Sequence, residues 1–252
     1  MHTIVSNPSA NSSGSPADSL SAFPADLRPA CALDLHGLIV NLALACAAVV
    51  FAMLSVFLLT GIGQDPLQSV HAPAEYATIL LRNPAMLRTV IGLDNLFIVL
   101  YASLFLTLGS ALSYQSKRRA MLVASIGLLL LSGLLDLLEN MHFMTMLAAA
   151  EHGLEIGAPQ IELQVCESLA KFHLSYLGLF LLGFVLPNTS RLERALCLSM
   201  RWLQLLVGLL IYLVPKQLAI PLVLTRFSFF LFALLAMAAI FRRRKSGSGA
   251  PE

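Results

Sequence analysis

The stretch GLIVNLALACAAVVFAMLSVFLLT, residues Gly37–Thr60, contains no charged side chain. An α-helix rises 1.5 Å per residue, so roughly 20 apolar residues cross the ~30 Å hydrocarbon core of a bilayer. Backbone N–H and C=O groups in lipid must be hydrogen-bonded internally, and the alternating pattern of barrel strands is absent here. The stretch is therefore predicted to be a transmembrane helix.

The composition of the whole chain indicates the same class. Of its 252 residues, 58% are hydrophobic and only 12% are charged, and the mean hydropathy is +0.80. Soluble domains carry about 45–50% apolar and about 25% charged residues. The formal net charge is only +2, and no patch of basic and aromatic residues suggests a nucleic-acid partner.

Five further apolar runs follow the first one. The sequence predicts an all-α, polytopic membrane protein, a six-transmembrane-helix bundle with disordered termini. The membrane domain is expected at 35–241, with spans at about 37–60, 87–112, 120–148, 163–186, 196–214 and 219–241.

The two ends of the chain are expected to be tails. Residues 1–34 are rich in Ser, Pro, Asn and Asp, and no basic segment precedes an apolar one at the start, so a disordered tail is favoured over a signal peptide. Residues 242–252 form a basic tail.

The connections between spans indicate the orientation. Tyr114–Arg119, Asn188–Ala195 and the tail at 242–252 are rich in Lys and Arg, and they alternate with Glu151–Glu162 and Pro215–Leu218, which together hold one lysine. Cytoplasmic loops are the ones enriched in Lys and Arg. We expect both termini to be cytoplasmic, in the inner or plasma membrane of the cell.

The longest connection, Gly61–Pro84, is then external. Within it, Ala74–Arg82 is apolar enough for a short helix. Such a helix would lie on the membrane surface or cover the bundle as a lid.

Ionisable and amide residues gather in the outer halves of four spans. They are Asp94 and Asn95, then Asp136, Glu139, Asn140 and His142, then Glu167, Lys171 and His173, and finally Arg226. Counted from the inner end, each of these spans has about 15–17 uncharged residues, or about 23–26 Å of helix, before its innermost charge. The charges are therefore predicted to share one layer near the outer edge of the hydrocarbon core.

Helical spacing predicts which of these side chains meet. Residues three or four apart share a face, so Asp136, Glu139 and Asn140 form one face that Ser132 continues inward. Glu167 and Lys171 form another face, which Ser175 extends.

Charges inside a bilayer normally face the bundle and pair. We expect Lys171 to pair with Asp136 or Glu139, and Arg226 with Asp94. Two of the four carboxylates then lack a cation.

This surplus of acid suits a pocket that binds or translocates a proton, a small ion or a headgroup-bearing solute. One alternative is an intramembrane enzyme on a lipid or apolar substrate, with Glu139 or Asp136 as general acid or base, although no nucleophile motif is present. Another is a purely structural subunit, in which the charged pairs only lock the helices together or form a wetted outer rim.

No metal site and no cofactor are predicted. The cysteines Cys31, Cys46, Cys166 and Cys197 are scattered and form no CxxC pair. A haem between His142 and His173 is the one alternative. The expected partner is the lipid bilayer, and a homo-oligomer or a partner membrane subunit remains open.

Overall fold

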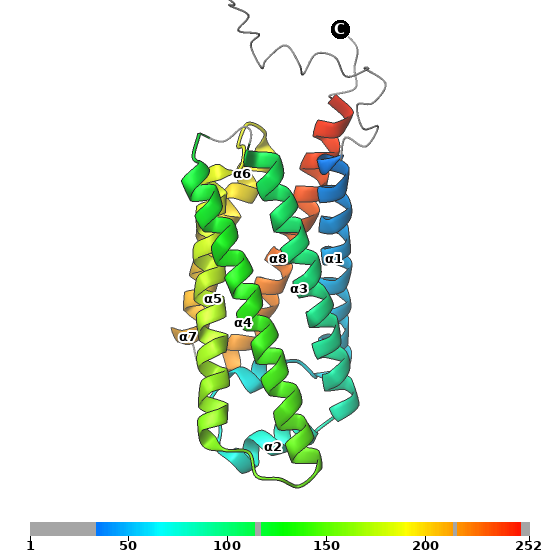
Figure 1. Ribbon diagram of the computed structural model, residues 1–252, viewed down its shortest axis with the longest axis vertical. Helices are drawn as coiled ribbons and strands as arrows, with labels where there is room; N and C mark the ends of the chain where they lie inside the picture. The colour runs from blue at the N-terminus through cyan, green and yellow to red at the C-terminus, as the bar shows by residue number, and fades with distance from the viewer. Residues whose placement is uncertain (1–33, 114–116, 214–215, 248–252) are drawn as a thin grey trace, which may run out of the picture. The chain divides into compact units, whose positions relative to one another are not determined.

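The computed structural model describes residues 34–113, 117–213 and 216–247 of the chain. Within these ranges the regular structure is entirely helical, and six helices are long and apolar enough to cross a membrane (Figure 1). The predicted all-α, six-span fold is confirmed.

The elements follow one another along the chain as helices of very different length. They are α1 (Leu35–Thr60), the 3₁₀ turn η3 (Asp65–Gln68), α2 (Pro73–Leu81), α3 (Pro84–Ser113), α4 (Arg119–Glu151), α5 (Ala158–Val185), α6 (Arg191–Leu198), the π-helical turn η4 (Ser199–Leu203), α7 (Gln204–Leu213) and α8 (Lys216–Gly247). The predicted fifth span is divided among α6, η4 and α7.

Local sequence signals explain several of the helix ends. Proline occupies an early position in α2 and in α5, where its missing N–H costs no hydrogen bond. Ser190 and Glu193 form a capping box at the start of α6. Gly61 and Gly153, which follow α1 and α4, have φ near +66° and +67°, a left-handed conformation that glycine adopts without steric cost.

The long helices pack side by side into a closed bundle. Helix α4 packs between α3 and α5, α1 packs between α3 and α8, and η4 and α7 complete the ring by packing on α5 and α8. Figure 1 shows α2 at one end of this bundle and α6 at the opposite end. We call these the α2 end and the α6 end.

Small residues let α4 and α5 approach closely. A Cβ atom on Gly178 would lie 2.8 Å from the Cγ atom of Leu129, closer than real side chains pack. Ser125 Oγ donates a hydrogen bond to the Gly178 carbonyl (2.8 Å), and Ser132 Oγ donates to the Lys171 carbonyl (2.9 Å). Such small-residue contacts with interhelical hydrogen bonds are typical of membrane helix pairs.

The predicted short helix in the 61–84 connection is confirmed as α2. Its Tyr76 and Leu80 are fully buried, and they belong to an apolar cluster with residues of α3, α4 and α5. One face of α2 therefore packs on the protein and covers the end of the bundle.

The C-terminal end differs from the expected tail. Helix α8 continues through Arg242–Gly247, so the basic segment begins as helix. The other tail residues, 1–33 and 248–252, lie outside the described part of the chain.

Candidate functional site

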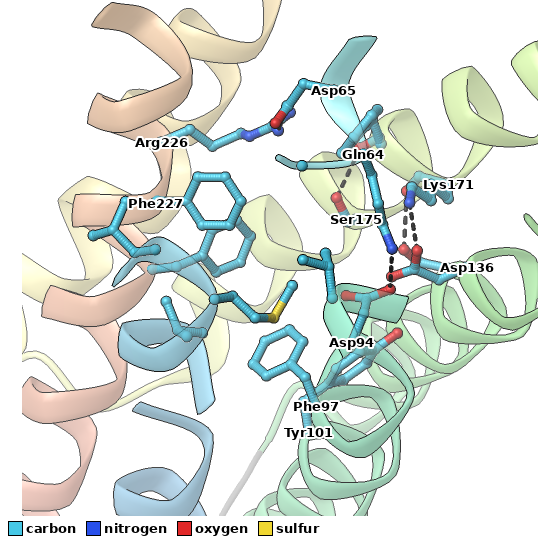
Figure 2. A pocket seen from close by; sticks show the side chains of 18 of the residues that line it. Gln64, Asp65, Asp94, Phe97, Tyr101, Asp136, Lys171, Ser175, Arg226 and Phe227 are labelled. Atoms are coloured by element: carbon cyan, nitrogen blue, oxygen red, sulfur yellow. Dashed lines mark hydrogen bonds and ion pairs between the residues drawn. The ribbon is translucent and has the colours of Figure 1, made fainter. Parts of the chain in front are cut away.

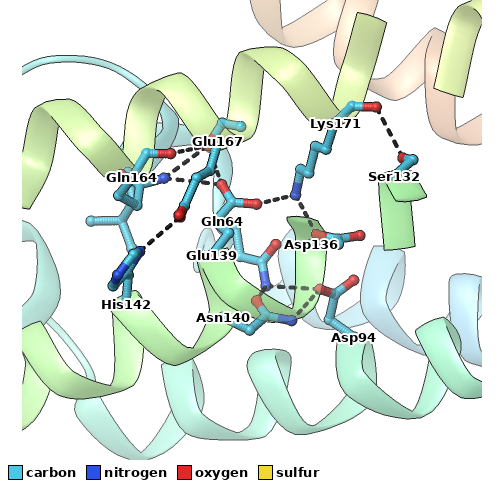
Figure 3. Close-up of polar contacts among 12 residues, drawn as sticks. Gln64, Asp94, Ser132, Asp136, Glu139, Asn140, His142, Gln164, Glu167 and Lys171 are labelled. Atoms are coloured by element: carbon cyan, nitrogen blue, oxygen red, sulfur yellow. Dashed lines mark hydrogen bonds and ion pairs between the residues drawn. The ribbon is translucent and has the colours of Figure 1, made fainter. Parts of the chain in front are cut away.

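The centre of the charged layer is an ion-pair triad between α4 and α5 (Figure 3). The Nζ atom of Lys171 contacts the carboxylates of both Asp136 and Glu139, which confirms the predicted pairing. Lys171 is 5% exposed and Glu139 is completely buried. Glu139 also accepts hydrogen bonds from Ser168 Oγ and from Gln164 Nε2 (3.0 Å). The buried charges are thus paired and hydrogen-bonded, as the low-dielectric surroundings require.

A second network surrounds Asp94 on α3. The Nδ2 atom of Asn140 donates to Asp94 Oδ2 (2.7 Å) and to Asn95 Oδ1 (2.9 Å). Gln64, from the loop before η3, donates through Nε2 to Asp94 Oδ2 (3.3 Å) and to Asn140 Oδ1 (2.9 Å). The donors to Asp94 in this network are neutral amides.

The predicted pairing of Arg226 with Asp94 is wrong. Arg226 is paired with Asp65, at 3.2 Å between Nη2 and Oδ1. Its guanidinium also lies over the ring of Phe172, 4.5 Å from the centroid, where cation–π attraction supports it. The reason for the difference is the path of the loop after α1, which folds back into the bundle and places Asp65 nearer than the acid on α3.

A cavity of about 180 Å³ lies among these networks (Figure 2). It is lined by α1, the loop from Ile62 to Gln68, α3, α4, α5 and α8. The lining residues with polar side-chain groups are Gln64, Asp65, Gln68, Asp94, Tyr101, Ser132, Asp136, Lys171, Ser175 and Arg226. Much of the remaining wall is leucine and phenylalanine, including Leu54, Leu104, Leu129, Leu179, Phe105 and Phe230.

The size of the cavity limits what it can hold. An engineered apolar cavity of about 150 Å³ accepts benzene, and drug-sized ligands occupy about 300 Å³ or more. A cavity of about 180 Å³ therefore suits a small or single-chain molecule better than a lipid with two acyl chains.

Seven of the nine predicted site residues fall into two groups. Asp94, Asp136, Lys171 and Arg226 line the cavity. Glu139 and Asn140 contact members of that first group, and Asn95 accepts a hydrogen bond from Asn140. None of these three residues lines the cavity.

His142 and Glu167 form a separate pair, with 2.7 Å between Nδ1 and Oε2, away from the cavity wall. His173 is exposed, and its Nδ1 lies 2.7 Å from the Leu169 carbonyl. These contacts direct the two imidazoles to different partners, so they give the haem hypothesis no support.

The sequence interpretation missed Gln64 and Asp65. Both precede Pro66 in a connection that reads as an ordinary polar loop. Tyr76 fastens this loop, since its hydroxyl donates to Gln164 Oε1 (3.0 Å) and lies 3.3 Å from the Leu67 carbonyl. Burial raises the pKa of Tyr76 above its ordinary value, so the phenol stays neutral and remains a hydrogen-bond donor.

The charges around the cavity do not balance. The carboxylates are Asp65, Asp94, Asp136 and Glu139, and the cations are Lys171 and Arg226. With every carboxyl group counted as ionised, the formal excess is two negative charges. Within the described ranges no group of three or more His, Cys, Asp or Glu side chains has a geometry suited to a metal ion.

The fold and this cavity define the chain as a polytopic helical membrane protein with a charged, partly apolar cavity inside its bundle. Comparison with protein-family models, with curated proteins and with solved structures found no match to the chain.

Proposed function

We propose that the protein binds a small amphipathic molecule inside its helix bundle. The supporting observation is the division of the cavity wall into two parts. Charged and amide side chains such as Gln64, Asp136 and Arg226 form one part, and leucine and phenylalanine side chains form the other (Figure 2). A molecule with a polar head and an apolar chain matches both parts at once.

The energetic argument concerns the charged groups. Buried charges in a membrane protein are expensive, and where they occur they normally serve an ion, a substrate or a proton pathway. Here they line an open volume rather than filling it with side chains. The apolar wall then supplies the favourable part of binding, at about 25 cal/mol for each Å² of apolar surface buried.

Binding is favoured over hydrolysis because the two serine hydroxyls at the cavity are otherwise engaged. Ser132 donates to the Lys171 carbonyl and Ser175 donates to the Phe172 carbonyl (2.9 Å). A nucleophilic serine needs a base within hydrogen-bond reach. Neither of these two serines has such a contact with a side-chain base.

The proposed orientation has both termini in the cytoplasm and the charged part of the cavity in the outer half of the membrane. The support is the distribution of basic residues, which the fold gathers at the α6 end. They are Lys117, Arg118 and Arg119 before and at the start of α4, Arg191 and Arg194 on α6, and Arg242, Arg243, Arg244 and Lys245 on α8. Cytoplasmic segments carry such residues.

The test fills the apolar part of the cavity with a larger side chain. Leu54 of α1 lines the cavity, whereas Leu58, one turn further along, is 63% exposed and is not part of the cavity wall. We would compare Leu54→Trp with the matched control Leu58→Trp, both in phosphatidylcholine nanodiscs. The probes are n-octylamine, n-octanoate and n-octanol, and the measurement is the rise in unfolding temperature that a bound ligand causes.

At least one probe is expected to stabilise the wild-type protein and the Leu58→Trp variant, and to lose its effect in Leu54→Trp. If no probe stabilises the wild-type protein, or if the effect persists in Leu54→Trp, the proposed function is wrong.

A further inference from the structure

Asp94 differs from the other carboxylates at the cavity in its partners. Asp65 is paired with Arg226, and Asp136 and Glu139 share Lys171. No cation within salt-bridge distance of Asp94 belongs to the described residues, and the side chain is only 6% exposed while lining the cavity. Its hydrogen-bond donors are the amides of Asn140 and Gln64.

The contact from Gln64 is the longer of the two hydrogen bonds that Asp94 accepts. The amide comes from the loop rather than from a transmembrane helix, and its 3.3 Å distance to Asp94 Oδ2 is long compared with 2.7 Å for the Asn140 donor. Hydrogen bonds from a charged donor to a carboxylate are shorter and roughly twice as strong as neutral ones. A charged N–H donor in the cavity would therefore replace Gln64 at this oxygen.

The formal charge balance disfavours an anionic head group. The cavity region carries a formal excess of two negative charges, and both cations are already paired with acids. An anionic head would add a further negative charge beside Asp94 in a low-dielectric site, where like charges repel strongly. A positive head would reduce the imbalance.

We propose that the molecule bound in this cavity carries an ammonium group on a single apolar chain, and that the ammonium displaces the Gln64 amide from Asp94. The chain lies against the leucine and phenylalanine wall. This inference rests on the proposed function, because it assigns the chemical class of the head group to the same cavity.

The experiment compares probes with one chain length and different heads. Calorimetric titration of the full chain in phosphatidylcholine nanodiscs, with empty nanodiscs as the blank, gives a Kd for n-octylamine, n-octanoate and n-octanol. We expect n-octylamine to bind about ten-fold more tightly than either other probe, the ratio that one stronger, charge-assisted hydrogen bond supplies.

Three variants test the contact itself. Asp94→Asn is expected to weaken n-octylamine binding about ten-fold and leave n-octanol binding unchanged. Gln64→Ala removes the competing internal donor and is expected to tighten n-octylamine binding several-fold. Glu162→Gln is the control for carboxylate loss, because Glu162 is exposed on α5 and does not line the cavity; it should bind n-octylamine as the wild type does.

The outcomes separate the two proposals. If n-octanoate or n-octanol binds as tightly as n-octylamine, or if Gln64→Ala weakens n-octylamine binding, the ammonium inference is overturned and the binding function stands. If none of the three probes binds the wild-type protein, the proposed function fails first. Should Asp94→Asn not fold, the probe comparison and Gln64→Ala still decide the question.

Discussion

Each end of the bundle has a buried carboxylate, but the two carboxylates have different surroundings. At the α6 end, Glu193 accepts hydrogen bonds from the backbone N–H groups of Thr189 and Ser190 (both 2.9 Å), from Thr189 Oγ1 (2.6 Å) and from Arg244 (2.6 Å). The carboxylate is saturated with donors, one of them a cation. At the α2 end, Asp94 has amide donors and faces a cavity.

This contrast shows how a polar contact that only stabilises the fold differs from a candidate binding site. In a purely stabilising contact, protein partners satisfy every polar group, and no cavity adjoins the charged side chain. The α2 end has paired charges too, yet its acids outnumber its cations and an open volume lies among them. Buried ion pairs alone therefore do not mark function; charge imbalance beside a cavity is the more informative observation.

The largest effect on stability is expected at the α2 end, for Lys171→Met. It leaves two carboxylates in a buried site without their shared cation, and breaking a buried pair in this way costs about 3–5 kcal/mol. Denaturant unfolding in detergent micelles measures the change.

The double variant Lys171→Met with Glu139→Met sharpens the result. If the triad serves only to hold α4 and α5 together, removing both partners should be better tolerated than removing either alone. A double variant as unstable as the sum of the two single variants would show that the partners do not stabilise each other.

A smaller effect is expected at the α6 end, for Glu193→Ala. The change removes the capping box of α6 and the ion pair to α8, at a cost of about 2 kcal/mol for hydrogen bonds to a charged group. Binding of n-octylamine should remain as in the wild type, since this residue is remote from the cavity wall. Loss of binding without unfolding would contradict the view that the α6 end only stabilises the fold while the binding site lies toward the α2 end.

Next comes Tyr76→Phe, which removes one hydroxyl and keeps the ring. Gln164 Oε1 and the Leu67 carbonyl lose their donor, at about 1 kcal/mol. Because the hydroxyl fastens the loop that carries Gln64, hydrogen exchange of residues 61–72 should speed up while that of α4 stays unchanged. Equal exchange in both proteins would show that the apolar contacts of Tyr76 hold the loop without it.

The smallest effect is expected for Glu151→Gln, at the exposed pair between Arg88 and Glu151. Exposed ion pairs contribute little because water and salt screen them. No measurable change in unfolding temperature is expected, and a clear loss would indicate that this pair is shielded by lipid or by a partner.

The sequence predicts the fold because hydropathy and span length directly reflect the thickness of a bilayer. It also predicts the triad of Lys171, Asp136 and Glu139. Helical spacing places the two acids on one face, and the high free energy of an unpaired charge inside the bilayer favours pairing with the lysine. The loop contacts were not predictable in this way. Gln64 and Asp65 lie in a connection with no periodicity, and their position depends on tertiary packing that also brings α8 close.

Helix α8 contributes one arginine to an ion pair near the cavity and another to an ion pair at the α6 end. Arg226 contacts Asp65 near the cavity, and Arg244 contacts Glu193 at the opposite end. About 27 Å of helix separates these two arginines, at 1.5 Å per residue, and no proline interrupts that segment. One continuous helix therefore ties together two distant parts of the chain, the loop after α1 through Arg226 and the cap of α6 through Arg244.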